Sequence, residues 1–339
     1  MAKCFINGIG VIAAQDVLLP TDQFSTLNED VNLAVEPVYK ELIAPNLIRR
    51  MSKGVKMGIY ASQVALNEAN VTVPDAVITG TGLGCIEDSE KFLKGILDND
   101  EQFLTPTSFI QSTHNTVGAQ IALRLQCKGY NFTYVNRDSS FEMALLDGLM
   151  QIKADEEQNI LVGGIDEVSD HTIKLLQIAE IIRSEKNKNA ALYAEGANFF
   201  ALSNTKQENT YAEVVDVTIC NQVADVNTWI TEFLAKNNTS ISEVDAVIMG
   251  INNTEVNAQY NQSLLAVFQH KTILHYKHLI GQFDTASAYG LGLAAQYMKH
   301  KKVSDNFIYS GSIGSVQQVL LVNQNFGKDY SLVLLKEAN

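Results

Sequence analysis

Short runs of apolar residues alternate along the chain with stretches whose apolar residues recur every three or four positions. Such runs, bounded by turn residues, are typical of buried strands, and the three-to-four spacing is typical of amphipathic helices. The pattern predicts strands at 4–13, 76–80, 131–136, 159–163, 197–202, 211–219, 246–250, 272–275, 307–310 and 316–322. It predicts helices at 55–70, 116–125, 141–153 and 287–300. Strands that alternate with helices indicate βα units with largely buried sheets.

The two halves of the chain resemble each other. Asp75-Ala-Val-Ile-Thr-Gly80 and Asp245-Ala-Val-Ile-Met-Gly250 are both a strand followed by a turn, at matching places in the two halves. A polar stretch at 203–210 separates the halves. Internal similarity of this kind indicates a duplication. We therefore expect two similar α/β halves, residues 1–204 and 205–339.

Composition and charge exclude several function classes. The chain has 339 residues, of which 46% are hydrophobic and 19% are charged, and this profile is that of a folded protein with a large core. No apolar run approaches the ~20 residues of a membrane-spanning helix. The net charge of −13 argues against a basic face for nucleic acid or for an anionic membrane. An acidic partner would have to meet a local basic patch.

The cysteines and the N-terminus indicate a reducing compartment. The four cysteines lie far apart, without the close spacing of a zinc site or a dense disulfide framework: Cys4, Cys85, Cys127 and Cys220. The first residues run directly into a predicted strand and do not have the pattern of a signal peptide. We expect a cytoplasmic protein.

Two weak motifs do not predict a cofactor. Gly80-Thr-Gly-Leu-Gly84 follows a strand but lacks the third glycine of a dinucleotide-binding turn, and acidic residues that would repel a phosphate follow it. His275 and His278 are three residues apart, without a nearby acidic residue to complete a metal site. We expect neither a cofactor nor a metal ion.

Asp138-Ser-Ser-Phe-Glu142 precedes the most apolar predicted helix. Ser139, followed three residues later by Glu142, predicts a capping box, and Asp138 suits the positive end of the helix dipole. The start of a buried helix also suits a nucleophile, because amide donors there lower the pKa of a thiol. From these residues alone, a helix cap is the better-supported interpretation.

Eight stretches, in order along the chain, resemble motifs of β-ketoacyl synthases. They are Arg49-Arg-Met-Ser52, Lys128-Gly-Tyr-Asn131, residues 133–140, residues 159–166, Ala194-Glu-Gly-Ala197, residues 249–254, residues 277–282 and residues 310–315. The resemblance covers nearly the whole chain. It implies an α/β, thiolase-like fold in which two similar α/β halves with buried five-stranded sheets are stacked in α-β-α-β-α layers.

The same resemblance assigns positions to the catalytic set of the family. Counted back from the Gly-Gly pair at 163–164, Asp138 stands where the family has its nucleophilic cysteine. Met249 and Gln282 match the two histidines, and Lys277 is retained. A carboxylate is a poor acyl acceptor and methionine does not shuttle protons. We therefore expect no condensing activity from this chain alone and assign no catalytic residue. The resemblance places a gating loop at Ser312, Ile313 and Gly314.

Family members that keep the fold but lack the cysteine pair with an active ketosynthase as chain-length factors. The sequence resembles those of the aryl polyene, flexirubin and type II polyketide kind. This resemblance implies a ketosynthase subunit as the partner in a heterodimer, or a second copy in a homodimer, and an acyl carrier protein with a phosphopantetheine-linked acyl chain. The implied dimer strand carries Tyr130, Phe132 and Tyr134. The residues implied to face the partner's acyl channel are Gln111, Thr113, His114 and Thr116.

Two other functions remain open at this point. The chain could be a stand-alone acyl-processing enzyme, such as a malonyl carrier decarboxylase or an acyltransferase of the 3-oxoacyl synthase class, that uses Asp138, His114 or Gln282. It could also be an inactive homodimer that binds a carrier protein. We prefer the chain-length factor, acting in fatty acid or polyketide biosynthesis, because Asp138 would repel the carboxylate of a malonyl group.

Overall fold

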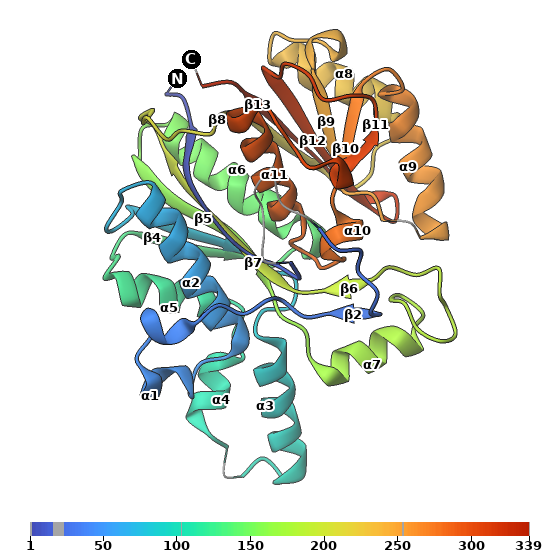
Figure 1. The fold of residues 1–339 in the computed structure, drawn as a ribbon. Coiled ribbons are helices and arrows are strands. Elements are labelled where there is room, and N and C mark those ends of the chain that lie inside the picture. Colours follow the sequence, from blue (N-terminus) through green and yellow to red (C-terminus); the bar gives the residue numbers. More distant parts are fainter. Residues whose placement is uncertain (1, 16–23, 103, 253, 339) are drawn as a thin grey trace.

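The structure is a computed structural model that describes residues 2–15, 24–102, 104–252 and 254–338 (Figure 1). Its strands are β1 (Phe5–Ile12), β2 (Val31–Asn32), β3 (Ala76–Gly80), β4 (Tyr130–Tyr134), β5 (Asn159–Asp166), β6 (Tyr193–Ala194), β7 (Gly196–Ser203), β8 (Ala212–Cys220), β9 (Ala246–Met249), β10 (Thr272–His275), β11 (Ile308–Ser310), β12 (Gln318–Asn325) and β13 (Lys328–Lys336). Its α-helices are α1 (Pro45–Ile48), α2 (Lys53–Glu68), α3 (Ile86–Asp98), α4 (Pro106–Gln111), α5 (Thr116–Leu125), α6 (Ser140–Lys153), α7 (Asp170–Ile178), α8 (Val226–Lys236), α9 (Glu255–Val267), α10 (Lys277–Ile280) and α11 (Ser287–His300). Short 3-10 helices lie at Tyr39–Glu41, Arg137–Ser139, Ile241–Glu243 and Asp305–Phe307.

The two halves have the same strand order. In the first half the order is β4-β3-β5-β7-β1, and in the second it is β10-β9-β12-β13-β8. In each half the first three strands in this order are parallel, and the last two pair antiparallel to their neighbours. The repeat explains why two stretches of the sequence resemble each other: they are β3 and β9, each the second strand along the chain among the five of its sheet.

The sheets are joined edge to edge. Phe5 and Ile6 of β1 pair with Glu213 and Ala212 of β8, so the ten strands and β11 form one eleven-stranded sheet. Two five-stranded sheets were expected, and the short β11 is an addition at the outer edge of the second one. A separate two-stranded sheet pairs β2 with β6.

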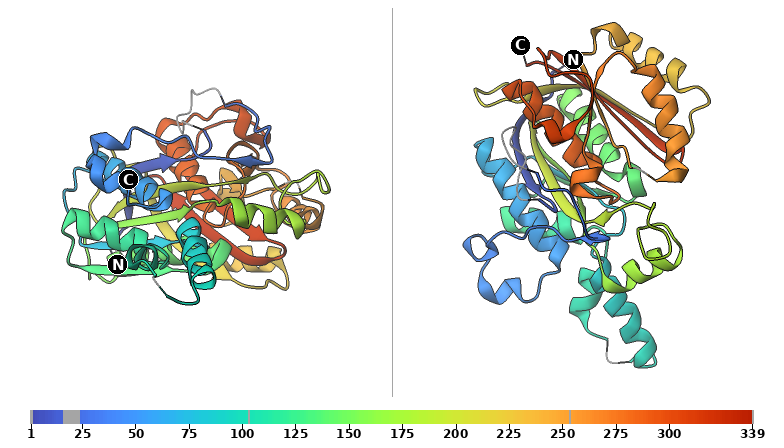
Figure 2. Two further views of the ribbon diagram at one scale, coloured as in Figure 1. Left: turned by 90° about the horizontal axis from the view of Figure 1, so that it is seen from below. Right: turned by 45° about the vertical axis from the view of Figure 1, so that its right-hand side comes forward.

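Three layers of helices cover the sheets, and each layer has its own hydrophobic core. Helices α2 and α5 pack on the outer face of the first sheet, α6 and α11 fill the space between the sheets, and α8 and α9 cover the outer face of the second (Figures 1 and 2). Glycines let α2 lie directly on β1, because a Cβ on Gly10 would be 1.8 Å from the Ala61 carbonyl oxygen. The expected α-β-α-β-α layers are confirmed.

The pattern of apolar residues located most of the sheet. The ranges expected for β3 and β10, and for α5 and α11, have the bounds that the structure shows. The strand β13 and the helices α3, α7, α8 and α9 were not predicted. The apolar stripes of these helices lie on one face only, and that periodicity is a weaker signal than a continuous buried run.

One part projects from the layered body. Helices α3 and α4 form a hairpin at the lower end of the molecule, and α7 lies beside it (Figures 1 and 2). Every residue of α3 remains at least partly exposed. Among the described residues, no helix is long and apolar enough to cross a membrane.

Candidate functional site

Asp138 lies where the central helix α6 begins and reaches across to the second half. Its Oδ1 accepts a hydrogen bond of 3.1 Å from Gln282 Nε2, which comes from the segment between α10 and α11. Its Oδ2 accepts one of 2.6 Å from Asn325 Nδ2, at the end of β12. The sequence analysis correctly placed Asp138 and Gln282 together. It did not identify Asn325, whose stretch of sequence carried no recognised motif.

Lys277 is the positive charge of this cluster. It is buried, and burial lowers the pKa of its ammonium, while the nearby carboxylates of Asp138 and Glu142 oppose that shift. Burial raises the pKa of Asp138, and the charge of Lys277 and the hydrogen bond from Asn325 oppose it. Lys277 and Asp138 therefore stabilise each other's charged forms inside the protein.

Two more aspartates tie the cluster to the surrounding loops. Asp166, at the end of β5, accepts hydrogen bonds from the backbone N–H groups of Gly82 and Thr285, each at 2.8 Å, and thereby links the halves. Asp284 lies beside Arg137, with 3.7 Å between Oδ2 and Nη1. Burial, with the negative charges of Asp166 and Asp138, raises the pKa of Asp284 to about 8. Burial therefore favours the protonated form of Asp284.

Glu142 does not form the expected capping box. Ser139, the residue that caps α6, makes no side-chain capping hydrogen bond. The Glu142 carboxylate instead points into the layer between the sheets, where Ser331 Oγ donates to it at 2.9 Å and Asn323 Nδ2 at 3.3 Å. Burial raises its pKa. Glu142 is thus part of a buried polar network behind Asp138, which the local sequence motif could not reveal.

Met249 does not face this cluster, and the prediction that it does is wrong. Side chains alternate between the faces of a strand, and Met249 belongs to the outer hydrophobic core with Phe233 and Leu264. Gly250, one residue later, is the position that points inward: a Cβ there would lie 3.1 Å from Lys277 Cε and 2.2 Å from Asn323 Oδ1. Asn253, of the same matched stretch, lies outside the described residues.

The predicted gating loop lies at the other end of the sheet. Ser312, Ile313 and Gly314 precede β12, whose first residue, Gln318, donates its N–H to Asp245 just before β9 begins. Asp138 instead lies at the opposite ends of these parallel strands. The end of β12, and not the stretch 312–314, lies beside Asp138.

The four residues expected to face a partner lie from the last residue of α4 to the first of α5. Thr113 Oγ1 and Thr116 Oγ1 share a hydrogen bond of 2.8 Å, and Thr116 also donates to the Ile110 carbonyl oxygen. Gln111 is buried, whereas His114 is exposed and packs against Gly84. The threonine pair fixes the turn that presents His114 to the outside.

The expected dimer strand, β4, is an edge strand of the large sheet. Tyr130 and Phe132 are stacked, with ring centroids 6.1 Å apart, and Phe132 contacts Tyr134 at 4.9 Å. Both tyrosine hydroxyls donate to Asp147 at 3.1 Å. The aromatic row is held in place from behind and is open to the outside.

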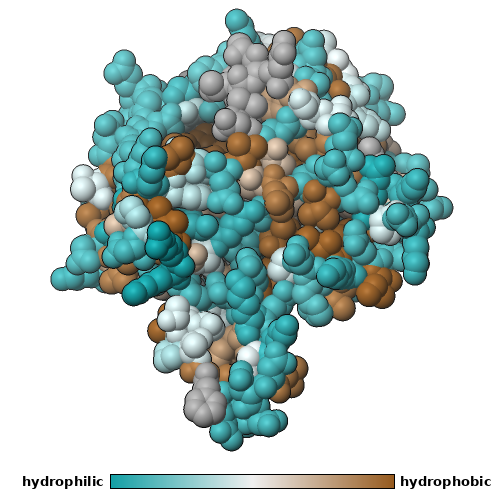
Figure 3. Space-filling view, turned by 60° about the horizontal axis from the view of Figure 1, so that its bottom comes forward, coloured by the Kyte–Doolittle hydropathy of each residue, from teal (hydrophilic) through white to brown (hydrophobic). Residues whose placement is uncertain are grey.

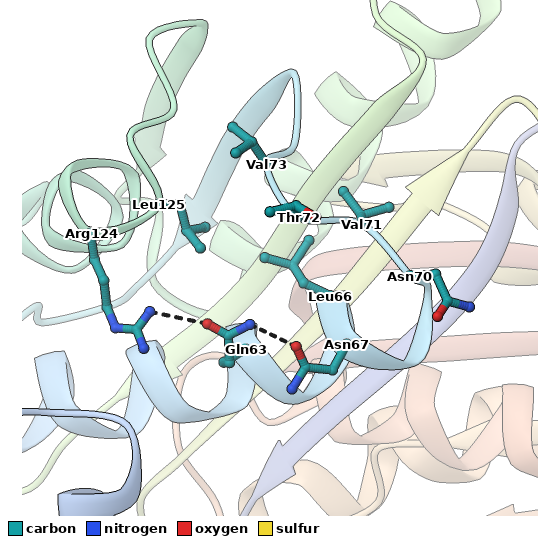
Figure 4. A pocket seen from close by; sticks show the side chains of 9 residues that line it. All are labelled: Gln63, Leu66, Asn67, Asn70, Val71, Thr72, Val73, Arg124 and Leu125. Atoms are coloured by element: carbon teal, nitrogen blue, oxygen red, sulfur yellow. Dashed lines mark hydrogen bonds between the residues drawn. The ribbon is translucent and has the colours of Figure 1, made fainter.

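Two cavities lie outside the Asp138 cluster. One, of about 560 Å³, lies between the ends of α2 and α5 and is lined by amide side chains and Arg124 (Figure 4). Another, of about 670 Å³, lies between α3 and α7 and is lined by leucines and lysines. Within the described residues, no group of three or more His, Cys, Asp and Glu side chains could hold a metal ion.

Comparison with known proteins agrees with this architecture. Residues 39–204 match the family model "Beta-ketoacyl synthase, N-terminal domain". The chain is ketosynthase-like. No curated protein matches the sequence of this ketosynthase-like chain.

Several solved structures share the fold of the ketosynthase-like chain from end to end. "The ishigamide ketosynthase/chain length factor" is 16% identical, with a TM-score of 0.81 and full coverage of both chains. A type II polyketide ketosynthase in complex with its acyl carrier protein is 13% identical, with a TM-score of 0.78, and covers 99% of this chain and 100% of that one. The ketosynthase ApeO in complex with its chain length factor ApeC, from Xenorhabdus doucetiae, is 14% identical, with a TM-score of 0.74 and coverage of 99% and 98%.

Proposed function

We propose that this chain is a chain-length-factor-like subunit that pairs with an active ketosynthase in the synthesis of a polyketide or polyene acyl chain. The observation that carries the proposal is the state of the Asp138 position. A condensing enzyme needs a nucleophile there that can accept an acyl group. Here a carboxylate is held by Gln282 and Asn325, and a backbone glycine, Gly250, faces Lys277 where no side chain fits.

The partner in this proposal is a ketosynthase that retains its cysteine and histidines. The edge strand β4 offers unpaired backbone groups and the exposed aromatic row of Tyr130 and Phe132, which suit antiparallel pairing with the same strand of a related subunit. In such a dimer Thr113, His114 and Thr116 would lie against the acyl channel of the partner. Solved ketosynthase and chain length factor complexes of this fold support the arrangement.

An acyl carrier protein would bring the growing chain. The complex of a ketosynthase of this fold with its carrier protein supports this part of the proposal. Although the chain is acidic overall, Arg49 and Arg50 are both exposed at the end of α1. These two cations provide a local basic patch for an acidic carrier.

The proposal has finer parts. We infer that residues 1–204 and 205–339 are the two ketosynthase-like halves, that the chain acts in the cytoplasm, and that the product is of the aryl polyene, flexirubin or related polyketide kind. The alternative, a decarboxylase or acyltransferase that acts alone, has less support because Asp138 already fills the place that an acyl acceptor needs.

The first experiment is affinity purification of the tagged chain from its native host, with the mass of the intact complex and identification of its components. We expect a one-to-one complex with a ketosynthase. Recovery of the chain alone, together with carbon dioxide release from malonyl carrier protein, would overturn the proposal in favour of a stand-alone enzyme.

The channel role is tested by Thr113→Trp in the purified complex. Thr113 lies at the turn between α4 and α5, and a larger side chain there would shorten the space for the growing chain. We expect shorter products by mass spectrometry, with complex formation unchanged. Leu123→Trp, on an exposed part of α5, is the control and should leave product length unchanged. Identical products from Thr113→Trp and the unaltered complex would exclude the channel role.

A further inference from the structure

The environment of Asp138 consists of hydrogen-bond donors and a buried cation. Each carboxylate oxygen accepts one N–H, from Gln282 on one side and Asn325 on the other. Lys277 is buried nearby and its charge lowers the pKa of the carboxyl group. Two amide donors and an ammonium group are the elements that proteins use to hold a carboxylate.

The orientation of one donor is fixed by a relay of hydrogen bonds. Thr254 Oγ1 donates to Asn252 Oδ1 at 3.1 Å, and Asn252 Nδ2 donates to Gln282 Oε1 at 3.4 Å. Because its oxygen is engaged by Asn252, Gln282 presents its NH₂ group to Asp138. The donor on this side is therefore set by residues that do not touch Asp138.

The donors and their ligand come from different halves. Gln282, Asn325 and Lys277 all belong to the second half, on three different elements, whereas Asp138 enters from the first half. The donors are positioned by the fold of the second half, and the carboxylate reaches them from outside. This arrangement is that of a preformed site and an intramolecular ligand.

We propose that the second half of this chain contains a carboxylate-binding site and that Asp138 fills it from within the same molecule. The ligand class is a small monocarboxylate anion, and the unaltered chain binds none because its own side chain occupies the donors. When the side chain of residue 138 is cut back to Cβ, the same donors become available to a free carboxylate of similar size, such as formate or acetate. This proposal does not depend on a ketosynthase partner, and its tests use the purified chain alone.

The test is Asp138→Ala, with acetate and formate as probes and the melting temperature and calorimetric titration as readouts. We expect the variant to be less stable than the unaltered chain and to regain stability in a saturable way as acetate is added. A hydrogen bond to a charged group contributes about 1.5–3 kcal/mol, so acetate should bind the variant at least about tenfold more tightly than it binds the unaltered chain. Chloride at equal ionic strength and neutral acetamide should have no such effect.

Asp245→Ala is the matched control. Asp245 also accepts two N–H groups, from Gln317 and Gln318, but it is exposed, so its removal opens no buried site. Acetate should leave this variant unchanged. A folded Asp138→Ala variant that responds to acetate no better than Asp245→Ala would overturn the proposal.

A second test serves if Asp138→Ala does not fold. Asp138→Asn places an amide against amide donors, and Asn325→Asp places two carboxylates together, so each single variant should be destabilised. The double variant restores one amide–carboxylate pair with the partners exchanged and should be more stable than either single variant. A double variant no more stable than the weaker single variant would show that these donors do not require a carboxylate, and would overturn the proposal.

Discussion

The surroundings of Asp138 contrast with the exposed apolar residues of β4 and of the α3–α4 hairpin, which are together called the apolar surface below. Around Asp138, charged and polar groups such as Glu142 and Lys277 are buried, and Glu142 accepts a hydrogen bond from Ser331. On β4 and the hairpin, large apolar side chains are exposed: 45% of the surface of Phe132 and 80% of that of Leu97 are accessible. Figure 3, which brings the bottom of the molecule forward, shows brown apolar side chains among teal polar ones on this side.

Isolated proteins usually show the reverse, with apolar groups inside and charged groups outside. Polar groups that already hydrogen-bond to one another leave few donors for an outside ligand, whereas an exposed apolar surface is typical of a site that another molecule covers. The difference favours the proposal that this chain acts through a surface that a partner covers. The predictions below test the two regions separately.

The largest expected effect is a loss of complex formation when the apolar surface is changed. Phe132→Asp places a charge in the middle of the aromatic row of β4, where pairing with a partner would bury it without a counterion. We expect the complex recovered from the host to weaken by about 4 kcal/mol or more, roughly 1000-fold, while the isolated chain stays folded. Size-exclusion chromatography and native mass spectrometry measure the loss.

The other edge of the same sheet offers the control. Tyr309 on β11 is also an exposed aromatic residue on an edge strand, with 46% of its surface accessible. Tyr309→Asp should leave the complex intact. If both variants dissociate it equally, or neither does, β4 has no special role in assembly.

A smaller effect, on the free energy of unfolding, is expected at the polar centre around Asp138. A Cβ on Gly250 would lie 2.2 Å from Asn323 Oδ1 and 2.9 Å from Tyr276 Oη, two groups that hydrogen-bond each other. Gly250→Ala should lower the free energy of unfolding by about 1–3 kcal/mol, as overpacking does in other cores. Urea denaturation followed by circular dichroism provides the measurement.

Gly314→Ala is its control, because no atom lies within 4 Å of a Cβ built there. That change should alter stability by no more than about 0.5 kcal/mol. Equal stability of the two variants would mean that the space beside Lys277 is open. It would contradict the inference that no side chain fits at Gly250.

The smallest expected effect is a pH dependence of the free energy of unfolding, caused by Asp284 in the polar centre. Burial, with Asp166 and Asp138 nearby, raises the pKa of Asp284 from 3.8 to about 8. Between these values the folded chain holds a proton that the unfolded chain has released. The stability that this proton contributes is therefore full below the unfolded pKa and is lost as pH rises to about 8.

Asp284→Asn should reduce the fall in stability between pH 6.5 and 8, measured by urea denaturation at several pH values. The window starts at 6.5 because burial lowers the pKa of His275 from 6.5 to about 4, an effect of opposite sign that acts below this window. Glu167, whose pKa burial raises to about 7, remains in both proteins, so some slope should persist. Parallel pH profiles would show that Asp284 is ionised in the folded chain.

The sequence predicted the sheet better than it predicted the site. Ala76–Gly80 and Thr272–His275 were located correctly because a fully buried parallel strand is a continuous apolar run between turn residues. Gly327, with a φ of 71°, lies in the turn that leads from β12 into β13. The prediction of strands from apolar runs did not use this glycine as a turn signal. The apolar residues of α3 all remain at least partly exposed in this chain. Such a helix has a weak hydrophobic pattern and is easily taken for a loop.

At the site, the errors have two physical causes. Met249 and Gly250 differ by one position, and a shift of one residue along a strand moves a side chain to the other face of the sheet. Asn325 and Glu142 reach Asp138 and Asn323 through pairings of residues more than 180 positions apart. Contacts between residues so far apart in the sequence form only when the sheet has folded, so no local sequence motif predicts them.

The place of β1 in the sheet has a consequence for how the chain is made. This strand is synthesised long before its partners β7 and β8, where Phe5 lies opposite Ser203 and Glu213. At about 5–20 residues per second, the ribosome needs roughly 10–40 s to deliver the strands that β1 must pair with. Throughout that time an apolar segment has no native neighbour on either edge. Newly made chains should therefore depend on chaperones until about two thirds of the protein has emerged, and a fusion at the N-terminus should slow folding more than one at the C-terminus.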